Sequence, residues 1–285
     1  MHLLIDAYHY LENQPDDIKF LAVSNVRTKI LLSLYDGPKK LAYLREKTGI
    51  ASSTIIHGLG QLENKNWISR RGDNSYLTSK GKIILVNLIK LMEKLETINK
   101  QHIFWKNHNL DGIPLKLQKD IHVLNESYLV QVKLDNLEEP FTRYLEMLSH
   151  ANNICAVLPV CFSRHNDAIQ RILVNGGFVK LILDKDILKQ FIEQFNSFDV
   201  IKFVKMGSLE IWVVPDNLEV ACVVSENFTS LGLFFENGVY DTSCLLMGYN
   251  KPALDWGNNL FHHYQNIAEK IDKNDIKQIE SWIKI

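Results

Sequence analysis

The segment between Ser24 and Gly81 places the narrowest constraint on the fold of this 285-residue chain. Three short amphipathic patterns predict helices at about 19–35, at 40–47 and from residue 52 onward. Two alternating segments on either side of Gly72-Asp73-Asn74 then predict a hairpin, and a further helix follows at about 79–100. This order is typical of a winged helix-turn-helix, in which the third helix enters a DNA groove and the hairpin lies on the flanking phosphates.

Several residues predict where these helices begin and end. Gly49 is well placed to end the second helix in the left-handed conformation. Ser52 and Ser53 are predicted to cap the third helix, and Thr78 to cap the helix that follows the hairpin.

The third helix is the predicted reader of DNA. Its buried face is predicted to hold Ile55, Ile56, Leu59 and Leu62. Its outward face is then Ser52, Ser53, Thr54, His57, Gly58 and Gln61. Hydroxyl, imidazole and amide groups bond phosphates and base edges, but this face lacks the arginine that most often reads guanine. We therefore expect modest or partly shape-based sequence recognition.

The charge of the chain is divided between two regions. Residues 24–82 carry 11 Lys and Arg against 4 Asp and Glu, a balance of +7, whereas the remainder has a balance of −8. A basic module on an acidic body suits a polyanionic partner for the module. The predicted phosphate contacts are Lys39, Lys40, Arg45, Arg70 and Arg71.

The second half of the chain reads as a mixed α/β domain. A change of composition at 101–115 places the boundary there, so we predict a DNA-binding domain over 1–100 and an effector domain over 101–285. Strands are predicted at 128–132, 154–160, 179–183, 201–204, 209–214, 220–224, 231–235 and 239–241. Helices are predicted at 3–11, 140–150, 165–174, 185–195, 254–271 and 275–283. The strand–helix–Gly176-Gly177–strand order predicts a parallel βαβ unit, and the short turns between later strands predict an antiparallel part. The fold class is therefore α+β with two domains.

Chemical motifs are scarce in this second half. None of the nucleotide-binding or hydrolase signatures occurs, so no catalytic residue and no cofactor is predicted. Ser163, Arg164 and His165 follow a predicted buried strand at the start of a helix, where α/β sheets bind ligands. These three residues are the predicted ligand contacts, with a polar helix cap or a Cys161–His165 nucleophile pair as alternatives.

The cysteines and histidines predict no metal site. Cys155, Cys161, Cys222 and Cys244 form no CxxC pair and have no histidine at zinc spacing. Reduced thiols in the core are expected. If residues 154–160 form one strand, Cys155 and Cys161 lie about 20 Å apart and cannot bridge each other.

Nothing in the sequence predicts a membrane association. No apolar run approaches the roughly 20 residues of a membrane helix, and no secretory signal is visible at the N-terminus. A cytoplasmic location is expected.

Pieces of both halves resemble one family. In the first half these are 26–34, Leu41-Ala-Tyr-Leu-Arg-Glu, Ser52-Ser-Thr, Leu59-Gly-Gln-Leu-Glu63 and Tyr76-Leu-Thr-Ser-Lys-Gly81. In the second half they are Phe104-Trp105, Ile113-Pro114, 231–234, Gly238-Val-Tyr-Asp241 and Asp255-Trp-Gly257 with Leu260-Phe261 and Tyr264. The chain resembles archaeal transcription regulators of the methanogenesis-regulatory, or filament-regulator, type.

The resemblance implies a DNA-binding domain joined to a sensor domain, acting as a dimer. It further implies that the second domain is similar to one half of a phospholipase D. The His-x-Lys catalytic motif of that enzyme is absent, so hydrolysis is not implied.

Together the patterns and the resemblance predict a homodimeric transcriptional regulator that binds double-stranded DNA and an unknown small-molecule effector. Two alternatives stay open. One is an enzyme whose winged domain makes protein contacts, for which a buried carboxylate–His or Cys–His pair beside a pocket would be evidence. The other is an adaptor that binds another regulator without DNA.

Overall fold

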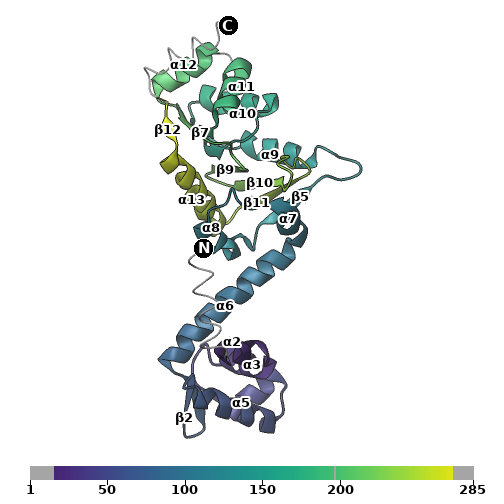
Figure 1. Cartoon of the computed structure of the whole chain (residues 1–285), viewed down its shortest axis with the longest axis vertical. Coiled ribbons are helices and arrows are strands. Elements are labelled where there is room, and N and C mark those ends of the chain that lie inside the picture. The colour runs from purple at the N-terminus through teal and green to yellow at the C-terminus, as the bar shows by residue number, and fades with distance from the viewer. Residues whose placement is uncertain (1–15, 196, 272–285) are drawn as a thin grey trace. The chain divides into compact units, whose positions relative to one another are not determined.

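The computed structural model describes residues 16–195 and 197–271, which form two compact units (Figure 1). The units meet in sequence between Met92 and Glu93, inside helix α6 (Ser79–Lys100). The boundary predicted after residue 100 stays a prediction. The helices predicted at 3–11 and 275–283 lie outside the described residues.

The N-terminal unit is built from short helices and a small sheet. Its helices are α2 (Asp16–Ala22), α3 (Asn25–Ser33), α4 (Leu41–Thr48), α5 (Ser52–Asn64) and the first part of α6. Its strands are β1 (Lys39–Lys40), β2 (Ile68–Arg71) and β3 (Asn74–Leu77), in the order β1-β3-β2. From α3 onward, three helices, a hairpin and a further helix follow one another as the sequence predicted, and α2 is an additional helix before them.

The helix ends were predicted with mixed success. Gly49 ends α4 at φ 68°, and the Thr78 hydroxyl accepts the backbone N–H of Gly81 at 3.0 Å, as expected. The helix predicted over 19–35 is wrong, because Ser24 starts a new helix by accepting the N–H of Arg27. The capping role of Ser52 and Ser53 is also wrong, since Ala51 precedes the first residue of α5.

The buried face of helix α5 differs from the predicted one. Ile55, Leu59 and Leu62 are buried as expected, but Ile56 is 48% exposed and Gly58 is buried. A Cβ at Gly58 would lie 2.9 Å from the Cδ1 of Ile30. The glycine therefore lets α5 pack closely against α3, and this contact sets which residues of α5 face out.

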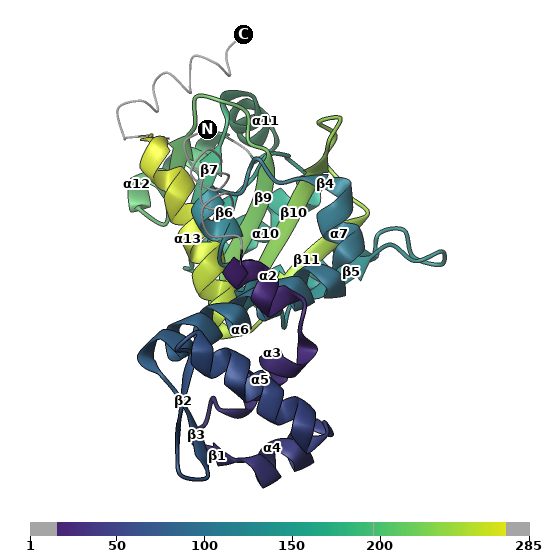
Figure 2. The ribbon, with the colours of Figure 1, turned by 60° about the horizontal axis from the view of Figure 1, so that its bottom comes forward.

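The C-terminal unit holds a mixed sheet with helices on both faces (Figure 2). Its helices are α7 (His102–Asn107), α8 (Leu115–Gln118), the 3-10 turn η1 (Ile121–Leu124), α9 (Glu139–Ser149), α10 (Ser163–Val174), α11 (Lys185–Phe195), α12 (Ser197–Met206) and α13 (Lys251–Ile267). Its strands are β4 (His108–Asn109), β5 (Tyr128–Gln131), β6 (Asn153–Val157), β7 (Phe178–Leu183), β8 (Leu209–Val213), β9 (Val220–Ser225), β10 (Thr229–Phe235), β11 (Cys244–Gly248) and β12 (Glu269–Lys270).

Among the described residues the strand order is β12-β8-β7-β6-β9-β10-β11-β5, with β4 paired to β10. Strands β6, β7 and β8 are parallel, so the predicted βαβ unit around α10 is confirmed. The pairs formed by β9, β10, β11 and β5 are antiparallel, also as predicted. One core lies between the sheet and α9–α12, and a second lies between the sheet and α13.

Two predicted strands are wrong. Residues 201–204 belong to α12, whose Val200, Phe203 and Val204 are buried at the spacing of a helix. Residues 239–241 form a loop with one bridge, Tyr240 to Phe234, and the strand of this region is β11, which the prediction missed.

Helix α13 is fixed to the unit by side chains of the family-like ending. The Trp256 indole donates to the carbonyl of Leu117 at 3.0 Å, and the Tyr264 hydroxyl donates to that of Gly112 at 2.7 Å. A Cβ at Gly257 would lie 2.4 Å from the Thr229 hydroxyl oxygen. This ending of the sequence therefore has a packing role. No helix in the described ranges is long and apolar enough to cross a bilayer.

Candidate functional site

The small sheet of the N-terminal unit arranges the predicted phosphate contacts in two rows. Lys39 is opposite Ser75, which is opposite Arg70, and Lys40 is opposite Asn74, which is opposite Arg71. Side chains in one row share a face of the sheet, and adjacent rows point to opposite faces. Ser75 is 4% exposed, whereas Arg70 of the same row is exposed, as are Lys40 and Arg71. Figure 2 shows β1, β3 and β2 side by side.

The basic residues in the row of Ser75, Lys39 and Arg70, already have partners inside the unit. The Arg70 guanidinium pairs with the Glu63 carboxylate of α5, and this hydrogen bond lowers the pKa of Glu63. The Lys39 ammonium lies 4.9 Å from the ring centre of Tyr43. Within the described part of the chain, Lys40, Arg45 and Arg71 make no ion pair and are exposed. These three are the free cations of the predicted set.

The exposed side of α5 carries Ser53, Thr54 and His57, with Ser52 half-buried and Ile56 beside them. Their exposure agrees with the predicted outward face, to which the exposed Ile56 adds an apolar side chain.

Gln61 differs from its predicted free position. Arg27, stacked on Phe20 at 3.9 Å, donates to the Gln61 Oε1 at 2.8 Å. The Gln61 amide nitrogen is then 3.0 Å from the Nε2 of His57. Because that amide can only donate, His57 must accept on Nε2 and carry its hydrogen on Nδ1. Gln61 therefore orients His57 from inside the unit.

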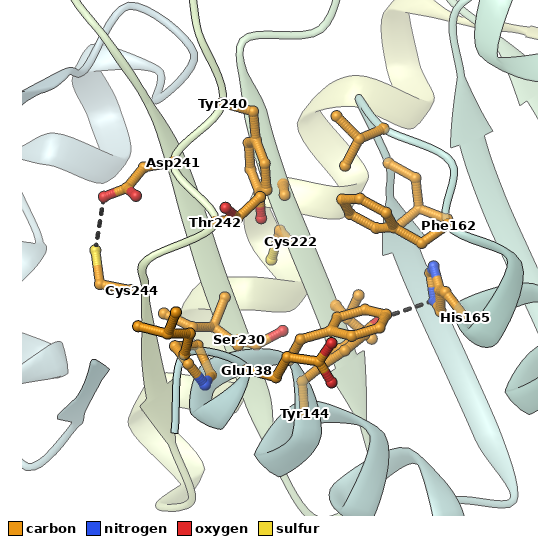
Figure 3. Close-up of a pocket in the computed structure, with 18 residues that line it drawn as sticks. Glu138, Tyr144, Phe162, His165, Cys222, Ser230, Tyr240, Asp241, Thr242 and Cys244 are labelled. Carbon is orange, nitrogen blue, oxygen red and sulfur yellow. Dashed lines mark hydrogen bonds between the residues drawn. The ribbon is translucent and has the colours of Figure 1, made fainter. Parts of the chain in front are cut away.

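A cavity of about 310 Å³ lies in the C-terminal unit between the sheet and helices α9 and α10 (Figure 3). Apolar side chains line most of it, and polar groups project from several elements. The lining residues include Glu138, Phe141, Tyr144, Phe162, His165, Val223, Ser230, Tyr240, Asp241, Thr242, Cys244 and Leu245. Its size and lining are those of a small-molecule site.

His165 lines this cavity and is 2% exposed. Its Nε2 is 2.7 Å from the hydroxyl oxygen of Tyr144, as the dashed line in Figure 3 marks. Because that hydroxyl has no other hydrogen-bond partner among the described residues, we assign it as the donor, which puts the ring hydrogen of His165 on Nδ1. Burial lowers the pKa of His165 from 6.5 to about 4 and raises the pKa of Tyr144. His165 is thus neutral near pH 7, and its Nδ1–H has no hydrogen-bond partner among the described residues.

The other predicted ligand residues lie outside the cavity lining. Ser163 is the exposed first residue of α10 and makes no capping bond. Arg164 pairs with Glu138, with 2.8 Å between nitrogen and oxygen, and its guanidinium lies 5.3 Å from the ring centre of Phe141. Glu138 and Phe141 line the cavity, so Arg164 contacts two lining residues without lining the cavity itself.

Tyr240 occupies space that a missing side chain leaves open. A Cβ at Gly232 would lie 2.2 Å from the Tyr240 hydroxyl oxygen, so the phenol lies directly over the glycine backbone. The sequence prediction missed Tyr144, Ser230 and Tyr240, since only the folded sheet brings them to one place.

At the opposite end of the cavity from His165, Asp241 joins two distant side chains. Its Oδ2 is 2.9 Å from the Nε2 of His108 and 3.1 Å from the Sγ of Cys244. All three residues are buried. The Asp241–Cys244 bond is drawn in Figure 3.

This trio bears on the enzyme alternative, because Asp241 and His108 form a buried carboxylate–histidine pair beside the cavity, which is the evidence that this alternative called for. The Cys244 thiol donates to Asp241 and makes no hydrogen bond to the His108 imidazole, so these side chains form no cysteine–histidine pair. Burial and the nearby carboxylate raise the pKa of the thiol well above its usual range. A protonated, buried thiol is a poor nucleophile.

All four cysteines are free thiols, as expected. The premise that Cys155 and Cys161 share one strand is wrong, because β6 ends at Val157. Cys161 instead accepts a hydrogen bond from the Asn166 amide at 3.3 Å, and no cysteine–histidine pair forms, because His165 bonds Tyr144.

Comparison with known proteins places the chain in a family. A model of the N-terminal domain of methanogenesis regulatory protein FilR1 matches residues 15–96, and one of its middle domain matches 137–267. The chain belongs to the FilR1 family of archaeal regulatory proteins. The expectation of such a family is confirmed.

A curated FilR1 from Methanothrix harundinacea (strain 6Ac) is 26% identical over 265 residues. That match covers 92% of this chain but 59% of the relative, so the chain spans about three fifths of the FilR1 that it matches.

Among solved structures, the archaeal chromatin protein TrmBL2 is 14% identical over 92% of this chain and 98% of its own, with a TM-score of 0.40. The phospholipase D family member Nuc from Salmonella typhimurium is 12% identical over 52% of this chain and 99% of its own, with a TM-score of 0.37.

The buried His165 predicts a pH-dependent stability for this FilR1-family chain. Its folded pKa lies below its unfolded value, so the unfolded state binds more protons between pH 6.5 and about 4. Stability is therefore complete above pH 6.5 and falls with pH through that window, by about 3 kcal/mol at most. Urea unfolding of the C-terminal unit at pH 7 and pH 4.5 measures the loss.

The matched variant is His165→Gln, whose amide oxygen still accepts the Tyr144 hydroxyl but does not titrate. The difference in unfolding free energy between the two pH values should shrink in this variant. Equal differences in wild type and variant would show that His165 does not cause the acid sensitivity.

Proposed function

We propose that the N-terminal unit is a winged helix-turn-helix that binds double-stranded DNA and regulates transcription. The observation that supports this most is the row of its sheet in which Lys40 and Arg71 flank Asn74 on an exposed face. Cations spaced across one face of the sheet suit successive phosphates, while the exposed Ser53, Thr54 and His57 of α5 suit a groove.

In this proposal the basic residues have different roles. Arg71, Lys40 and Arg45 contact phosphates directly because no carboxylate holds them. Arg70 binds Glu63 instead and keeps the hairpin against the end of α5. Family membership supports a regulatory role, and FilR1 itself is described as a methanogenesis regulatory protein.

We also propose that the chain forms a homodimer through α6. Ile84, Leu88, Leu91, Leu95 and Ile98 recur at intervals of four and three residues along this helix. That spacing is the signature of a coiled-coil seam. Leu91 and Leu95 are 52% and 51% exposed in the single chain. A second copy of α6 would present the same apolar spacing and could cover them.

The C-terminal unit is proposed to sense a small-molecule effector in its cavity. The cavity is of ligand size, and the Nδ1–H of His165 offers a donor without a protein partner. A ligand that favours one dimer arrangement would shift its population and so set the spacing of two winged modules. The dimer would then bind or release two DNA half-sites about one helical turn apart.

The phospholipase D-like topology, the two-domain boundary and the absence of catalysis remain predictions. The adaptor alternative predicts no DNA affinity at all and is tested together with the DNA proposal.

The DNA proposal predicts different effects for the two wing arginines. Arg71→Ala should weaken binding to a duplex from upstream of the chain's own gene roughly tenfold, about 1.4 kcal/mol, by removing a phosphate contact. The slope of log affinity against log salt should fall in magnitude by about 0.9. Arg70→Ala should weaken binding less, and the exposed Lys251→Ala should change nothing. Equal affinities for wild type and Arg71→Ala in band-shift titrations would exclude the hairpin from the interface.

The dimer proposal predicts that charge in the α6 seam separates the copies. Wild type should have a mass twice the 32.9 kDa of one chain in light scattering, and Leu91→Glu with Leu95→Glu should have the single mass. Lys90→Glu, on an exposed position of the same helix, is the control and should stay dimeric. A dimer that survives the double substitution would place the interface elsewhere.

The effector proposal predicts that filling the cavity removes ligand stabilisation. In a thermal-shift screen of metabolites, a true effector raises the melting temperature of wild type but not of Ser230→Leu, whose larger side chain occupies the cavity. Ser149→Leu, on an exposed position of α9, should respond like wild type. A compound that shifts all three proteins equally binds outside the cavity.

A further inference from the structure

The trio of His108, Asp241 and Cys244 has the composition of a metal site. Its three ligand atoms, one from each side chain, lie within 4.8 Å of one another. The side chains come from β4 and from the connection between β10 and β11 together with the first residue of β11, so two segments far apart in the sequence meet at one buried point. Sequence spacing could not reveal this set, since 133 residues separate His108 from Asp241.

We propose that this trio binds a zinc ion. Imidazole, carboxylate and thiolate are the ligands that zinc takes in proteins, at about 2.0–2.3 Å. Two such ligands around one tetrahedral ion lie about 3.3–3.5 Å apart. The Nε2–Oδ2 and Oδ2–Sγ separations are 2.9 and 3.1 Å, so shifts of a few tenths of an ångström open the trio around zinc.

The remaining polar atoms of the trio are already held in the way that metal ligands require. The Nδ1 of His108 is 2.6 Å from the carbonyl of Phe104, which can only accept, so Nδ1 carries a hydrogen. The Nε2 is therefore the atom available to a metal. The Oδ1 of Asp241 accepts the backbone N–H of Ser243 at 2.7 Å, which leaves Oδ2 as the ligand. Such outer bonds orient the ligands of known sites.

Zinc binds these side chains as neutral imidazole, carboxylate and thiolate, so any proton on Nε2 or Sγ leaves to solvent as the bonds to the metal form.

The site lies where it could affect the cavity. Asp241 and Cys244 belong to the cavity lining, at the end opposite His165 (Figure 3). Zinc in proteins is usually four-coordinate, so the three side chains leave one position for a water molecule or another donor atom. Three protein ligands with an exchangeable fourth form an open zinc site rather than a closed structural one.

Cobalt substitution tests the proposal on the full chain after treatment with EDTA. One equivalent of Co²⁺ should produce a near-ultraviolet thiolate-to-cobalt band, and one equivalent of Zn²⁺ should remove it. Cys244→Ser should lack this band, and His108→Gln should weaken cobalt binding at least about 100-fold. Both replacements can still donate a hydrogen bond to Asp241, so the metal-free network is preserved.

Two controls separate this site from others. Cys161→Ser should keep the band, because Cys161 bonds Asn166 and lies outside the trio. The double variant His262→Gln with His263→Gln should also keep it, since both histidines are exposed on α13. Absence of the band in wild type, or its persistence in Cys244→Ser, would overturn the proposal and leave a purely hydrogen-bonded trio.

A spectroscopic measurement on unaltered protein covers the case in which a variant fails to fold. X-ray absorption at the zinc edge should show one sulfur at about 2.3 Å and otherwise nitrogen and oxygen neighbours. A coordination shell without sulfur, or with two or more sulfurs, would contradict the assignment.

Discussion

The pairing of β1 with β3 is the constraint on which the proposed DNA surface depends. Two residues of β1 are enough to fix a register, and that register places Lys40 and Arg71 on one face and Lys39 and Arg70 on the other. A shift of one residue in this pairing would exchange Lys39 and Lys40 between the two faces, because side chains alternate along a strand. Lys39, which now lies near the Tyr43 ring, would then replace Lys40 on the face that holds Arg71. The sheet thus decides which basic residues are available.

The sequence predicted much of this unit because its signals are local. The left-handed Gly49 and the cap at Thr78 each depend on neighbouring residues, and both were found. The face of α5 was not, because Ile56 and Gly58 exchange roles through a packing contact with Ile30. The prediction placed Ile56 in the interior only because its side chain is apolar. Where a glycine allows two helices to approach, steric fit overrides hydrophobicity.

In the C-terminal unit, local signals predicted the helices and strands, whereas the sites depend on contacts between residues far apart in the sequence. The parallel βαβ unit follows from strand, helix and Gly176-Gly177, a pattern within about 30 residues. The cavity and the metal-like trio join residues more than 60 positions apart, such as Tyr144 with Tyr240 and His108 with Asp241. Even His165, which does line the cavity, was grouped with two neighbours that lie outside the lining. Helical periodicity sends adjacent residues to different faces, so a sequence triplet is a poor guide to a site.

The burial of the cavity determines which kind of ligand it can bind. The same burial that holds His165 neutral would oppose any charged group entering beside it, unless that group brought or found a partner. At the rim, Glu138 is already paired with Arg164. At the far end, Asp241 already accepts three donors in the metal-free protein. An effector without net charge, with an acceptor for the His165 Nδ1–H and an apolar body, therefore fits best. A zinc ion on the trio would change this preference at one end, because a metal with an open position attracts an anionic or neutral donor atom.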